Sequence, residues 1–550
     1  MTAAPLPREV EEERRGWLVA IFALAILLQL ELVFSRPVNW DEFFHLSEAH
    51  AFHQGRLTEA LQVFYARAFF WLPMLPFDAV DQIRVARVFM LGFELFTLYA
   101  IYAMAKRFAG RVPAALAALA YVTGGYVFQH GFSYRADPMA AAFLMGILWI
   151  LLASRLEAKA ILGAALLAGL AALTTIKIIL YAPAFAGIAW LRWREAERPG
   201  DIAWRLVAFG AAAALFALLF IGATMLSLPD VGHHSAAKTV ATSGSMMFDE
   251  GLFPQWGYGL GAVLAAPLLA VLIACTPFSI ARASLSKPQR IALIGLMLPL
   301  ASLLFYRNAF PYFYAYILPP VMVAAALAIR ALVARVSAKL LAIALLANAV
   351  IMSIATPREI LPTQKAVLAA VHEIFPEPVA YFDFPGMVVD FPKANFFMTT
   401  WGVRKYRAGI EESFVDAMTR ETVPLLIVNQ DEIARNQLDV EPWWAFLPAD
   451  AKALREGFIP HWGPIWVAGR RFPADGAQRS FVTYTPGTYT VEGAAARIDG
   501  RLYATGETLN LARGAHRFEP AGTGETVLRW GDHLRRPAKP FDGGPVFKDF

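Results

Sequence analysis

Blocks of apolar residues follow one another up to residue 355 and constrain the fold more than any other feature. A membrane-spanning helix needs about 20 largely apolar residues. The chain is 57% hydrophobic and 17% charged, whereas a soluble domain is about a quarter charged. The sequence therefore predicts an α-helical polytopic membrane protein with about 11 transmembrane helices. The expected spans cover 17–34, 85–105, 112–130, 138–154, 160–175, 176–192, 204–226, 258–278, 291–306, 313–333 and 339–355.

Lysine and arginine residues gather in alternate loops between these blocks. Lys106 and Arg107 follow the second expected span, and Arg192 and Arg194 follow the sixth. Such loops remain in the cytoplasm, so an odd number of spans places the carboxyl terminus outside the cell. High alanine content and short loops favour a bacterial plasma membrane over the endoplasmic reticulum. The same loops account for the net charge of +5, so a nucleic-acid partner is not expected. The segments expected outside are 35–84, 131–137, 227–257, 307–312 and everything after 355.

The composition changes after residue 355. Residues 1–355 are expected to form the membrane core, with a long first outer loop at 35–84. Short apolar runs with one helical pattern between them predict an extracytoplasmic α/β domain over 356–475. Polar and apolar residues then alternate, and Pro-Gly, Asp-Gly and Arg-Gly turn signals recur. This pattern predicts a small β-rich domain over 476–550.

Two adjacent carboxylates directly follow the first expected span. Asp41 and Glu42 lie in "NWDEFFHL", and the apolar residues after them recur at roughly helical spacing, so this segment should lie along the membrane surface. Solvated carboxylates are the ordinary explanation for such residues in a loop. Here, aromatic neighbours at the headgroup level would hold the pair away from water. Partial burial raises the pKa of a carboxyl group and suits a general base.

A second acidic site lies on the same expected side, in "YRADP". Asp137 before a proline is also an ordinary helix N-cap arrangement, and Arg135 could simply pair with it. Two acids from separate outer loops could nevertheless converge on one cavity. Lys177 and Arg307 add cations on this side. Each cation alone is more commonly an anchor to lipid headgroups, but together they suit a lipid phosphate.

Other polar residues give weaker signals. His45 could share a helical face with Glu42, but the loop histidines do not have the spacing of a metal site, and Cys275 is the only cysteine. A nucleotide site is not indicated, because the sequence contains neither a P-loop nor a GxGxxG after a strand. Glu94 lies near the middle of the second expected span, where a charge costs about 2.5–3.5 kcal/mol. Structural pairing and a functional role for Glu94 both remain open.

Taken together, these motifs resemble the GT-C superfamily of integral-membrane glycosyltransferases, above all protein O-mannosyltransferases and bacterial lipid A aminoarabinose transferases. The similar segments are "NWDEFFHL" after the first span, "YRADP" at 134–138, "LTTIK" ending at Lys177 and "FPYFYAYILPP" at 310–320. The resemblance covers roughly residues 15–355. The mannosyltransferases have His-Phe near their Asp-Glu pair, where this chain has His45 and Leu46.

The resemblance implies a GT-C fold and a catalytic core over 1–355 that transfers a sugar, with inversion, on the extracytoplasmic face. The donor would be a sugar on a polyprenyl phosphate, and the acceptor hydroxyl would belong to a glycan, a lipid or a protein. No cofactor is certain, although a divalent cation could help to bind the phosphate. The expected catalytic residues are Asp41, Glu42 and Asp137, with Asp41 as the base. The expected phosphate-binding residues are Lys177, Arg135 and Arg307, in falling order, and the expected acceptor or donor pocket contains His45, Trp40 and Tyr134.

A polytopic transporter or flippase for a lipid-linked or polymeric glycan is the alternative. Transporters tend to have inverted repeats and polar residues near the middle of the bilayer. The sequence shows no such repeat and, apart from Glu94, no such polar residue. A non-enzymatic assembly protein that binds a polymer would not explain adjacent carboxylates beside a surface helix.

Overall fold

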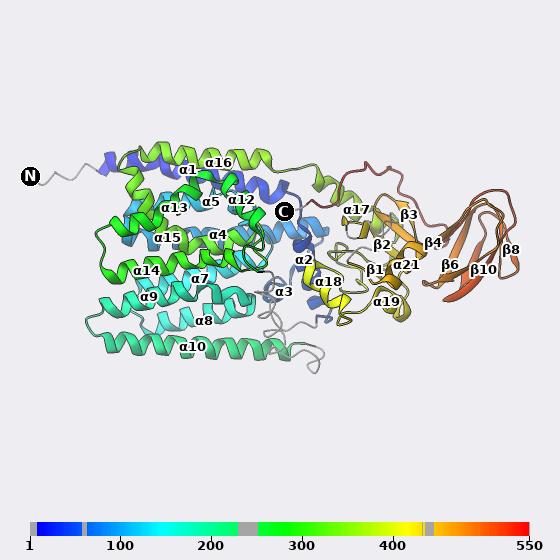
Figure 1. Cartoon of the computed structure of the whole chain (residues 1–550), viewed down its shortest axis with the longest axis horizontal. Helices are drawn as coiled ribbons and strands as arrows, with labels where there is room; N and C mark the ends of the chain where they lie inside the picture. Colours follow the sequence, from blue (N-terminus) through cyan, green and yellow to red (C-terminus); the bar gives the residue numbers. More distant parts are fainter. Residues whose placement is uncertain (1–7, 58–62, 229–250, 432, 435–444, 549–550) are drawn as a thin grey trace, which may run out of the picture.

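A computed structural model describes residues 8–57, 63–228, 251–431, 433–434 and 445–548. A bundle of roughly parallel helices forms one end of the molecule, and a region rich in strands forms the other (Figure 1). The amino terminus lies at the far end of the bundle, whereas the carboxyl terminus lies near the junction of the two parts.

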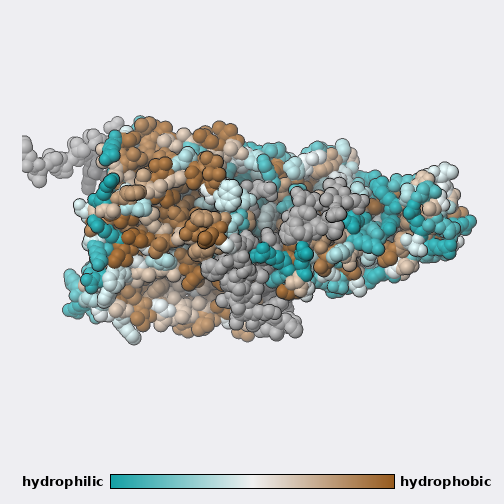
Figure 2. Space-filling view, in the orientation of Figure 1, coloured by the Kyte–Doolittle hydropathy of each residue, from teal (hydrophilic) through white to brown (hydrophobic). Residues whose placement is uncertain are grey.

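Within these described residues, seven helical segments are long and apolar enough to cross a membrane, or eight if one bent pair is counted as a span. This pair, α12 (Trp256–Ala265) and α13 (Pro267–Arg282), bends by 104°. Hydrophobic residues cover the bundle between two hydrophilic ends, as expected for a multi-pass membrane protein (Figure 2). The seven segments lie in α1 (Arg8–Ser35), α4 (Ala79–Ala109), α7 (Ala136–Ala153), η2 with α9 (Ile176–Tyr181 and Ala182–Glu195), α10 (Pro199–Leu226), α15 (Phe313–Val333) and α16 (Ala338–Ala355).

The three remaining expected spans are helical but shorter. These are α5 (Arg111–Val122, 12 residues), α8 (Ala158–Thr174, 17 residues) and α14 (Lys287–Met297, 11 residues), which continues as the 3₁₀ helix η3 (Leu298–Leu304). After α5 the chain turns at Gly125, whose φ of 47° is readily adopted only without a Cβ atom. Of the about eleven expected spans, seven are full-length in the described chain, or eight with the bent pair, two are shorter apolar helices, and one is the short α14 with η3.

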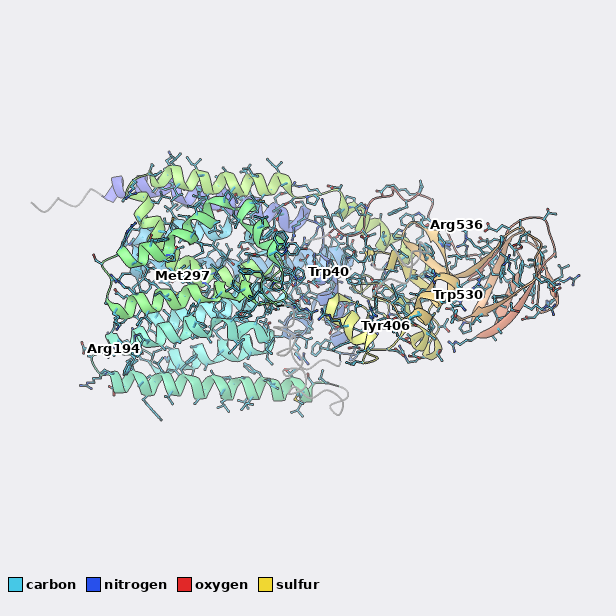
Figure 3. The ribbon with its side chains drawn as sticks, in the orientation of Figure 1. Trp40, Arg194, Met297, Tyr406, Trp530 and Arg536 are labelled. Carbon is cyan, nitrogen blue, oxygen red and sulfur yellow. The ribbon has the colours of Figure 1, made fainter. Side chains whose placement is uncertain are left out.

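The arginine-rich loops lie at the end of the bundle remote from the strands. Arg194 marks this end, and Trp40 lies at the opposite end (Figure 3). Arginine side chains at this end bind the last carbonyl groups of neighbouring helices: Arg107 donates to Leu152 (3.0 Å) and Arg330 to Phe108 (3.1 Å). The charged loops are thus sorted to one end as the sequence predicts, and the side of the membrane that this end faces stays a prediction.

The helix α2 (Trp40–His53) crosses the opposite end of the bundle, between the membrane helices and the strands (Figure 1). Its first turn is a capping box. The Asn39 side chain accepts hydrogen bonds from backbone N–H groups of this turn, and the Glu42 side chain accepts one from the backbone N–H of Asn39 (3.0 Å). Two short helices follow before α4, namely α3 (Phe64–Ala68) and the 3₁₀ helix η1 (Leu72–Met74).

The region after α16 packs directly on α2, and one hydrophobic core extends from the bundle into it. A seven-stranded sheet has the order β1-β2-β4-β11-β6-β9, with β3 paired to β4; β1 and β2 are parallel, and the other pairs are antiparallel. A four-stranded antiparallel sheet has the order β5-β10-β7-β8. The stacked rings of Phe472 and Phe518 lie between the two sheets, with centroids 3.8 Å apart.

The strands span both parts of the predicted carboxyl-terminal region. Because β4 pairs with β11, one sheet joins residues on either side of the boundary expected at residue 475, and that boundary stays a prediction. The strands are β1 (Tyr381–Phe382), β2 (Leu425–Ile427), β3 (Phe458–Trp462), β4 (Ile465–Phe472), β5 (Arg479–Thr483), β6 (Gly487–Gly493), β7 (Ala496–Ile498), β8 (Arg501–Tyr503), β9 (Thr508–Leu511), β10 (Gly514–Pro520) and β11 (Thr526–Trp530). The helices of this region are α17 (Ile360–Ile374), α18 (Thr399–Arg407), α19 (Phe414–Arg420) and α21 (Pro448–Gly457), and α6 (Tyr126–His130) completes the bundle.

Candidate active site

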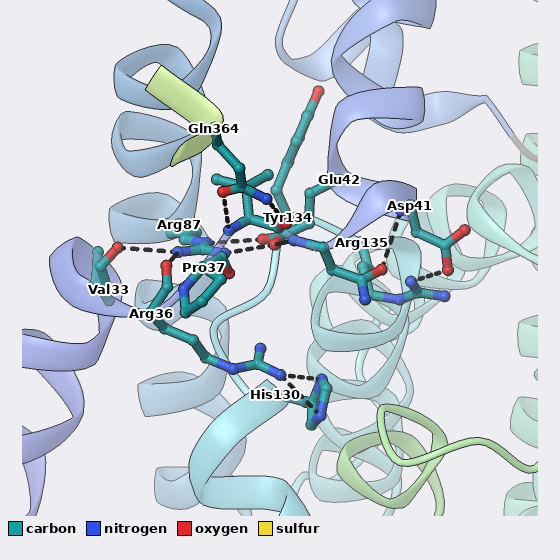
Figure 4. Close-up of polar contacts among 12 residues, drawn as sticks. Val33, Arg36, Pro37, Asp41, Glu42, Arg87, His130, Tyr134, Arg135 and Gln364 are labelled. Atoms are coloured by element: carbon teal, nitrogen blue, oxygen red, sulfur yellow. Dashed lines mark hydrogen bonds and ion pairs between the residues drawn. The ribbon is translucent and has the colours of Figure 1, made fainter. Parts of the chain in front are cut away.

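Glu42 and Arg87 form a fully buried ion pair below α2 (Figure 4). The arginine Nε donates to Glu42 Oε1 (2.8 Å) and its Nη2 to Oε2 (2.5 Å), a two-pronged arrangement that fixes the carboxylate plane. The backbone N–H groups of Asn39 (3.0 Å) and Tyr134 (2.8 Å) donate to the same oxygens. Burial alone would raise the pKa of Glu42, but Arg87 and these backbone donors hold it below its ordinary value. Both oxygens are therefore occupied within the protein.

Arg87 also joins the carboxyl-terminal end of α1 to this pair. Its guanidinium donates to the carbonyl oxygens of Val33 (3.3 Å), Arg36 (2.9 Å) and Pro37 (2.8 Å). One side chain thus connects α1, α2 and α4, and through Glu42 it reaches the loop before α7. The sequence reasoning assigned Arg87 no role, and the only available signal was an arginine at the edge of an apolar block.

Four side chains of alternating charge lie beside this pair. Arg135 forms an ion pair with Asp41, and its Nε lies 3.6 Å from Asp137 Oδ2. Lys177 forms an ion pair with the other oxygen of Asp137. All four are buried, with relative exposures of 7% for Asp41, 6% for Arg135, 2% for Asp137 and 9% for Lys177. The fold therefore brings together four predicted site residues from α2, the start of α7 and η2.

Aromatic rings from the start of α15 support the two cations. The Arg135 guanidinium lies 3.4 Å from the ring centroid of Tyr312, and Lys177 Nζ lies 5.4 Å from that of Tyr316. Cations over aromatic faces gain about 0.5–2 kcal/mol, most where water is excluded. Tyr312 falls within the segment "FPYFYAYILPP", but nothing in that pattern shows which cation its ring would contact.

Asp41 differs from Glu42 in both environment and free hydrogen-bonding capacity. Burial raises the pKa of Asp41 above its ordinary value, although Arg135 opposes this shift. Only Oδ2 accepts a hydrogen bond from Arg135; within the described part of the chain, Oδ1 accepts none. A carboxylate with a raised pKa and one unused oxygen has the properties of a general base.

His45 lies one turn after Asp41 on α2, and its ring lies near that of Tyr134, which precedes α7. Their rings lie 6.3 Å apart, and His45 also lies 4.1 Å from the ring of Tyr65. Burial, together with the charges of Arg135 and Lys177, lowers the pKa of His45 well below its ordinary value, so its imidazole is neutral. Among the described residues, His45 Nδ1 and Tyr134 Oη are buried without a hydrogen-bond partner. Buried polar atoms rarely remain unpaired, so these two are available to a ligand.

The other predicted residues lie around this group. Trp40 packs its ring edge-on against Phe384, 5.5 Å away, and so faces the strand-rich region. Arg307 is 5% exposed. Burial raises the pKa of the neighbouring Tyr306, on which the charges of Asp137, Arg135 and Arg307 also act. Glu94 lies deeper in the bundle, where its Oε1 accepts a hydrogen bond from Gln29 (3.1 Å).

Metal binding at these carboxylates is not supported by their neighbours. The described residues contain no group of three or more histidine, cysteine, aspartate or glutamate side chains placed to hold a metal ion. Arg135 and Lys177 lie against Asp41 and Asp137, where a divalent cation would otherwise balance the negative charge. A contribution from a divalent cation stays a prediction.

The overall fold resembles that of one protein solved in two states. No family model and no curated protein matches the sequence. The crystal structure of ArnT from Cupriavidus metallidurans bound to undecaprenyl phosphate superposes with a TM-score of 0.55 at 13% identity, over 75% of this chain and 93% of that chain. The apo structure of the same protein gives a TM-score of 0.51 at 13% identity, over 78% and 96% of the two chains. The chain therefore has the fold of ArnT, and its long apolar helices identify it as a multi-pass membrane protein.

Proposed function

We propose that this chain is a membrane glycosyltransferase that moves a sugar from a polyprenyl-phosphate donor to an acceptor hydroxyl. The observation that carries the proposal is the buried series Asp41, Arg135, Asp137 and Lys177 at the outer end of the bundle. It provides a base and two cations in one place, as transfer from a lipid phosphate requires. The ArnT fold supports the proposal, since one ArnT structure contains undecaprenyl phosphate.

Asp41 is the base of the proposed reaction. Its Oδ1 removes the proton from the acceptor hydroxyl as the hydroxyl oxygen attacks the anomeric carbon. The bond from that carbon to the phosphate oxygen breaks on the opposite face, and the phosphate leaves with the bonding electron pair, so the anomeric centre is inverted. Glu42 is assigned a positioning role, because its four hydrogen-bond donors fix the first turn of α2 around Asp41.

Lys177, Arg135 and Arg307 are the proposed phosphate ligands. Negative charge grows on the departing phosphate, and cations already held in place stabilise it without further rearrangement. Asp137 holds Lys177 and faces Arg135, so its proposed role is to orient both cations. Among the described residues, His45 and Tyr134 offer an unpaired ring nitrogen and an unpaired hydroxyl for sugar or acceptor groups.

An apolar groove supplies a place for the prenyl tail. It has a volume of about 710 Å³, lies between α13 and the α14–η3 segment, and is lined by residues that include Ile280, Met297, Leu300 and Leu304. Figure 3 places Met297 within the bundle, at membrane depth. Leu304 is two residues from Tyr306, on which the charges of Asp137 and Arg135 act. The groove thus leads toward the proposed phosphate site.

The proposed orientation places α2, the strands and the carboxyl terminus outside the plasma membrane. The sorting of the arginine-rich loops to the far end supports it. The acceptor is a glycan, a lipid or a protein reached from that side.

Purified full-length protein in liposomes tests the proposal against the transport alternative. With radiolabelled polyprenyl-phosphate sugars and a panel of acceptors, we expect label to move covalently to an acceptor as free polyprenyl phosphate accumulates. Movement of intact lipid-linked sugar between leaflets, without covalent transfer to any acceptor, would instead establish a transporter.

Replacing Lys177 with methionine is expected to raise the KM for the donor about 10–100-fold. The reason is the loss of one charge-assisted contact to the phosphate, which contributes about 1.5–3 kcal/mol. Initial rates at varied donor concentration measure the effect. The control is Lys106→Met. Lys106 is an exposed lysine near the carboxyl-terminal end of α4, far from the proposed site, and its replacement should leave the KM unchanged. An unchanged donor KM in Lys177→Met would remove Lys177 from the phosphate site.

Filling the groove is expected to discriminate between donors of different tail length. Met297→Trp should raise the KM for a long polyprenyl donor several-fold, but should affect a donor with a two- or three-isoprene tail much less, because the short tail does not extend along the groove. Leu340→Trp places the same ring on the lipid-facing surface of α16, outside the groove, and serves as the control. Equal effects on both donors would show that the tail binds elsewhere.

A further inference from the structure

The last residues of the chain return to the helix that carries Asp41. After β11, residues 531–548 form neither helix nor strand in the described chain and extend back along the sheet to the bundle (Figure 1). We call residues 531–548 the carboxyl-terminal strap. Chain ends are usually poorly ordered unless specific contacts hold them, and the contacts of this strap are therefore informative.

The middle of the strap is fixed to the hairpin of β3 and β4. His461 Nε2 lies 2.8 Å from the carbonyl oxygen of Arg535, and Trp462 Nε1 donates to that of Lys539 (2.8 Å). The rings of Trp462 and Phe541 meet edge to face at 5.2 Å. A Cβ atom at Gly463 would lie 2.5 Å from the Phe541 ring, so this close approach requires glycine.

The end of the strap contacts the first turn of α2 and the segment before it. Phe547 is 8% exposed, and its ring lies edge to face with that of Phe43, 5.8 Å away. The buried side chain of Gln364 donates to the carbonyl oxygens of Val546 (3.0 Å) and Val38 (2.7 Å), and accepts from the N–H of Val38 (3.0 Å). The two contacted positions, Val38 and Phe43, flank Asp41 and Glu42 in the sequence.

We infer that the carboxyl-terminal strap positions the catalytic carboxylate: Phe547 and Gln364 hold both flanks of Asp41, so that its Oδ1 is aligned with the acceptor. This inference rests on the proposed function. Arg87 holds the first turn of α2 through Glu42, and the strap adds a second contact through Phe43. Phe547 touches no reacting group and is therefore a positioning residue.

Removing the strap end is expected to lower kcat while leaving the KM for the donor nearly unchanged. A displacement of about 1 Å in a reacting group costs up to about 100-fold in rate, whereas the proposed phosphate ligands Lys177, Arg135 and Arg307 lie outside α2. The variants are a chain ending at Phe541 and the full chain with Phe547→Ala. Phe547→Leu retains much of the contact and should recover most of the kcat. The measurements are steady-state kinetics and hydrogen exchange of the α2 backbone amides, which should become faster in the first turn.

Rescue in trans separates positioning from general destabilisation. A synthetic peptide with the sequence of residues 542–550, DGGPVFKDF, should restore the kcat of the shortened chain, and the same peptide with Phe547→Ala should not. Phe108→Ala is the control for destabilisation. It removes a buried ring from the same hydrophobic core, at the carboxyl-terminal end of α4, and should lower the unfolding temperature without lowering kcat.

Wild-type kcat in the shortened chain would overturn the inference. So would a loss of kcat that the peptide does not rescue and that Phe108→Ala shows to the same extent. If the full-length chain transfers no sugar, the proposed function fails. Hydrogen exchange in α2 still tests the contact in that case, because unchanged exchange after truncation would overturn it.

Discussion

Replacing Asp41 with asparagine is expected to lower kcat by about 10²–10⁴-fold, the usual contribution of a general base. Asparagine has the same shape and can still accept a hydrogen bond from Arg135, but its amide cannot remove a proton at Oδ1. Binding of the donor should therefore change little. Turnover with a radiolabelled donor and equilibrium binding of the same donor measure the two quantities separately.

The matched control is Asp81→Asn. Asp81 lies at the same end of the bundle and pairs with Arg84 and Lys365, but it is partly exposed and outside the proposed site. It should retain full turnover. Wild-type turnover in Asp41→Asn would exclude Asp41 as the base, and loss of donor binding in that variant would indicate a binding role instead.

The same assignment predicts how the rate depends on pH. Burial raises the pKa of Asp41, and a base acts only in its deprotonated form. Transfer should therefore be present above this pKa and be lost as the pH falls through it, at a higher pH than the value of about 3.9 for an ordinary aspartate. A profile of kcat/KM against pH checks this. The acidic decline should be absent from the residual rate of Asp41→Asn.

Replacing Arg87 with methionine is expected to destabilise the protein by about 3–5 kcal/mol, the cost of breaking a buried ion pair on one side. Methionine fills much of the volume but leaves the fully buried Glu42 carboxylate without its charged partner. It also leaves the carbonyl oxygens of Arg36 and Pro37 without their donor. Denaturant or thermal unfolding in detergent measures the loss.

The double variant Arg87→Met with Glu42→Gln tests the cause. Removing the unpaired charge should recover part of the lost stability, so the two substitutions should be strongly non-additive. Arg84→Met removes a partly exposed arginine one turn earlier in α4 and should cost no more than about 1 kcal/mol. Additive losses in the double variant would show that the ion pair itself contributes little and that Arg87 acts through its carbonyl contacts alone.

The sequence by itself determined the features that arise from nearby residues. Apolar blocks, arginine-rich loops and the turn signals after residue 475 predicted a polytopic helical protein with a strand-rich carboxyl-terminal region. Asp41, Glu42 and Asp137 were found because acidic residues stand out next to apolar spans. The lengths of α5 and α14 were not predictable, because hydropathy records where apolar residues occur and not where packing ends a helix.

Only the tertiary structure decided which of these groups meet. Arg87 could be recognised as the partner of Glu42 only once α4 was packed beneath α2, and the order Asp41, Arg135, Asp137 and Lys177 arises from three separate elements. The return of Phe547 to Phe43 joins residues at opposite ends of the chain. Helix and strand patterns repeat over a few residues, whereas these pairings depend on how distant segments pack, and no local pattern records that.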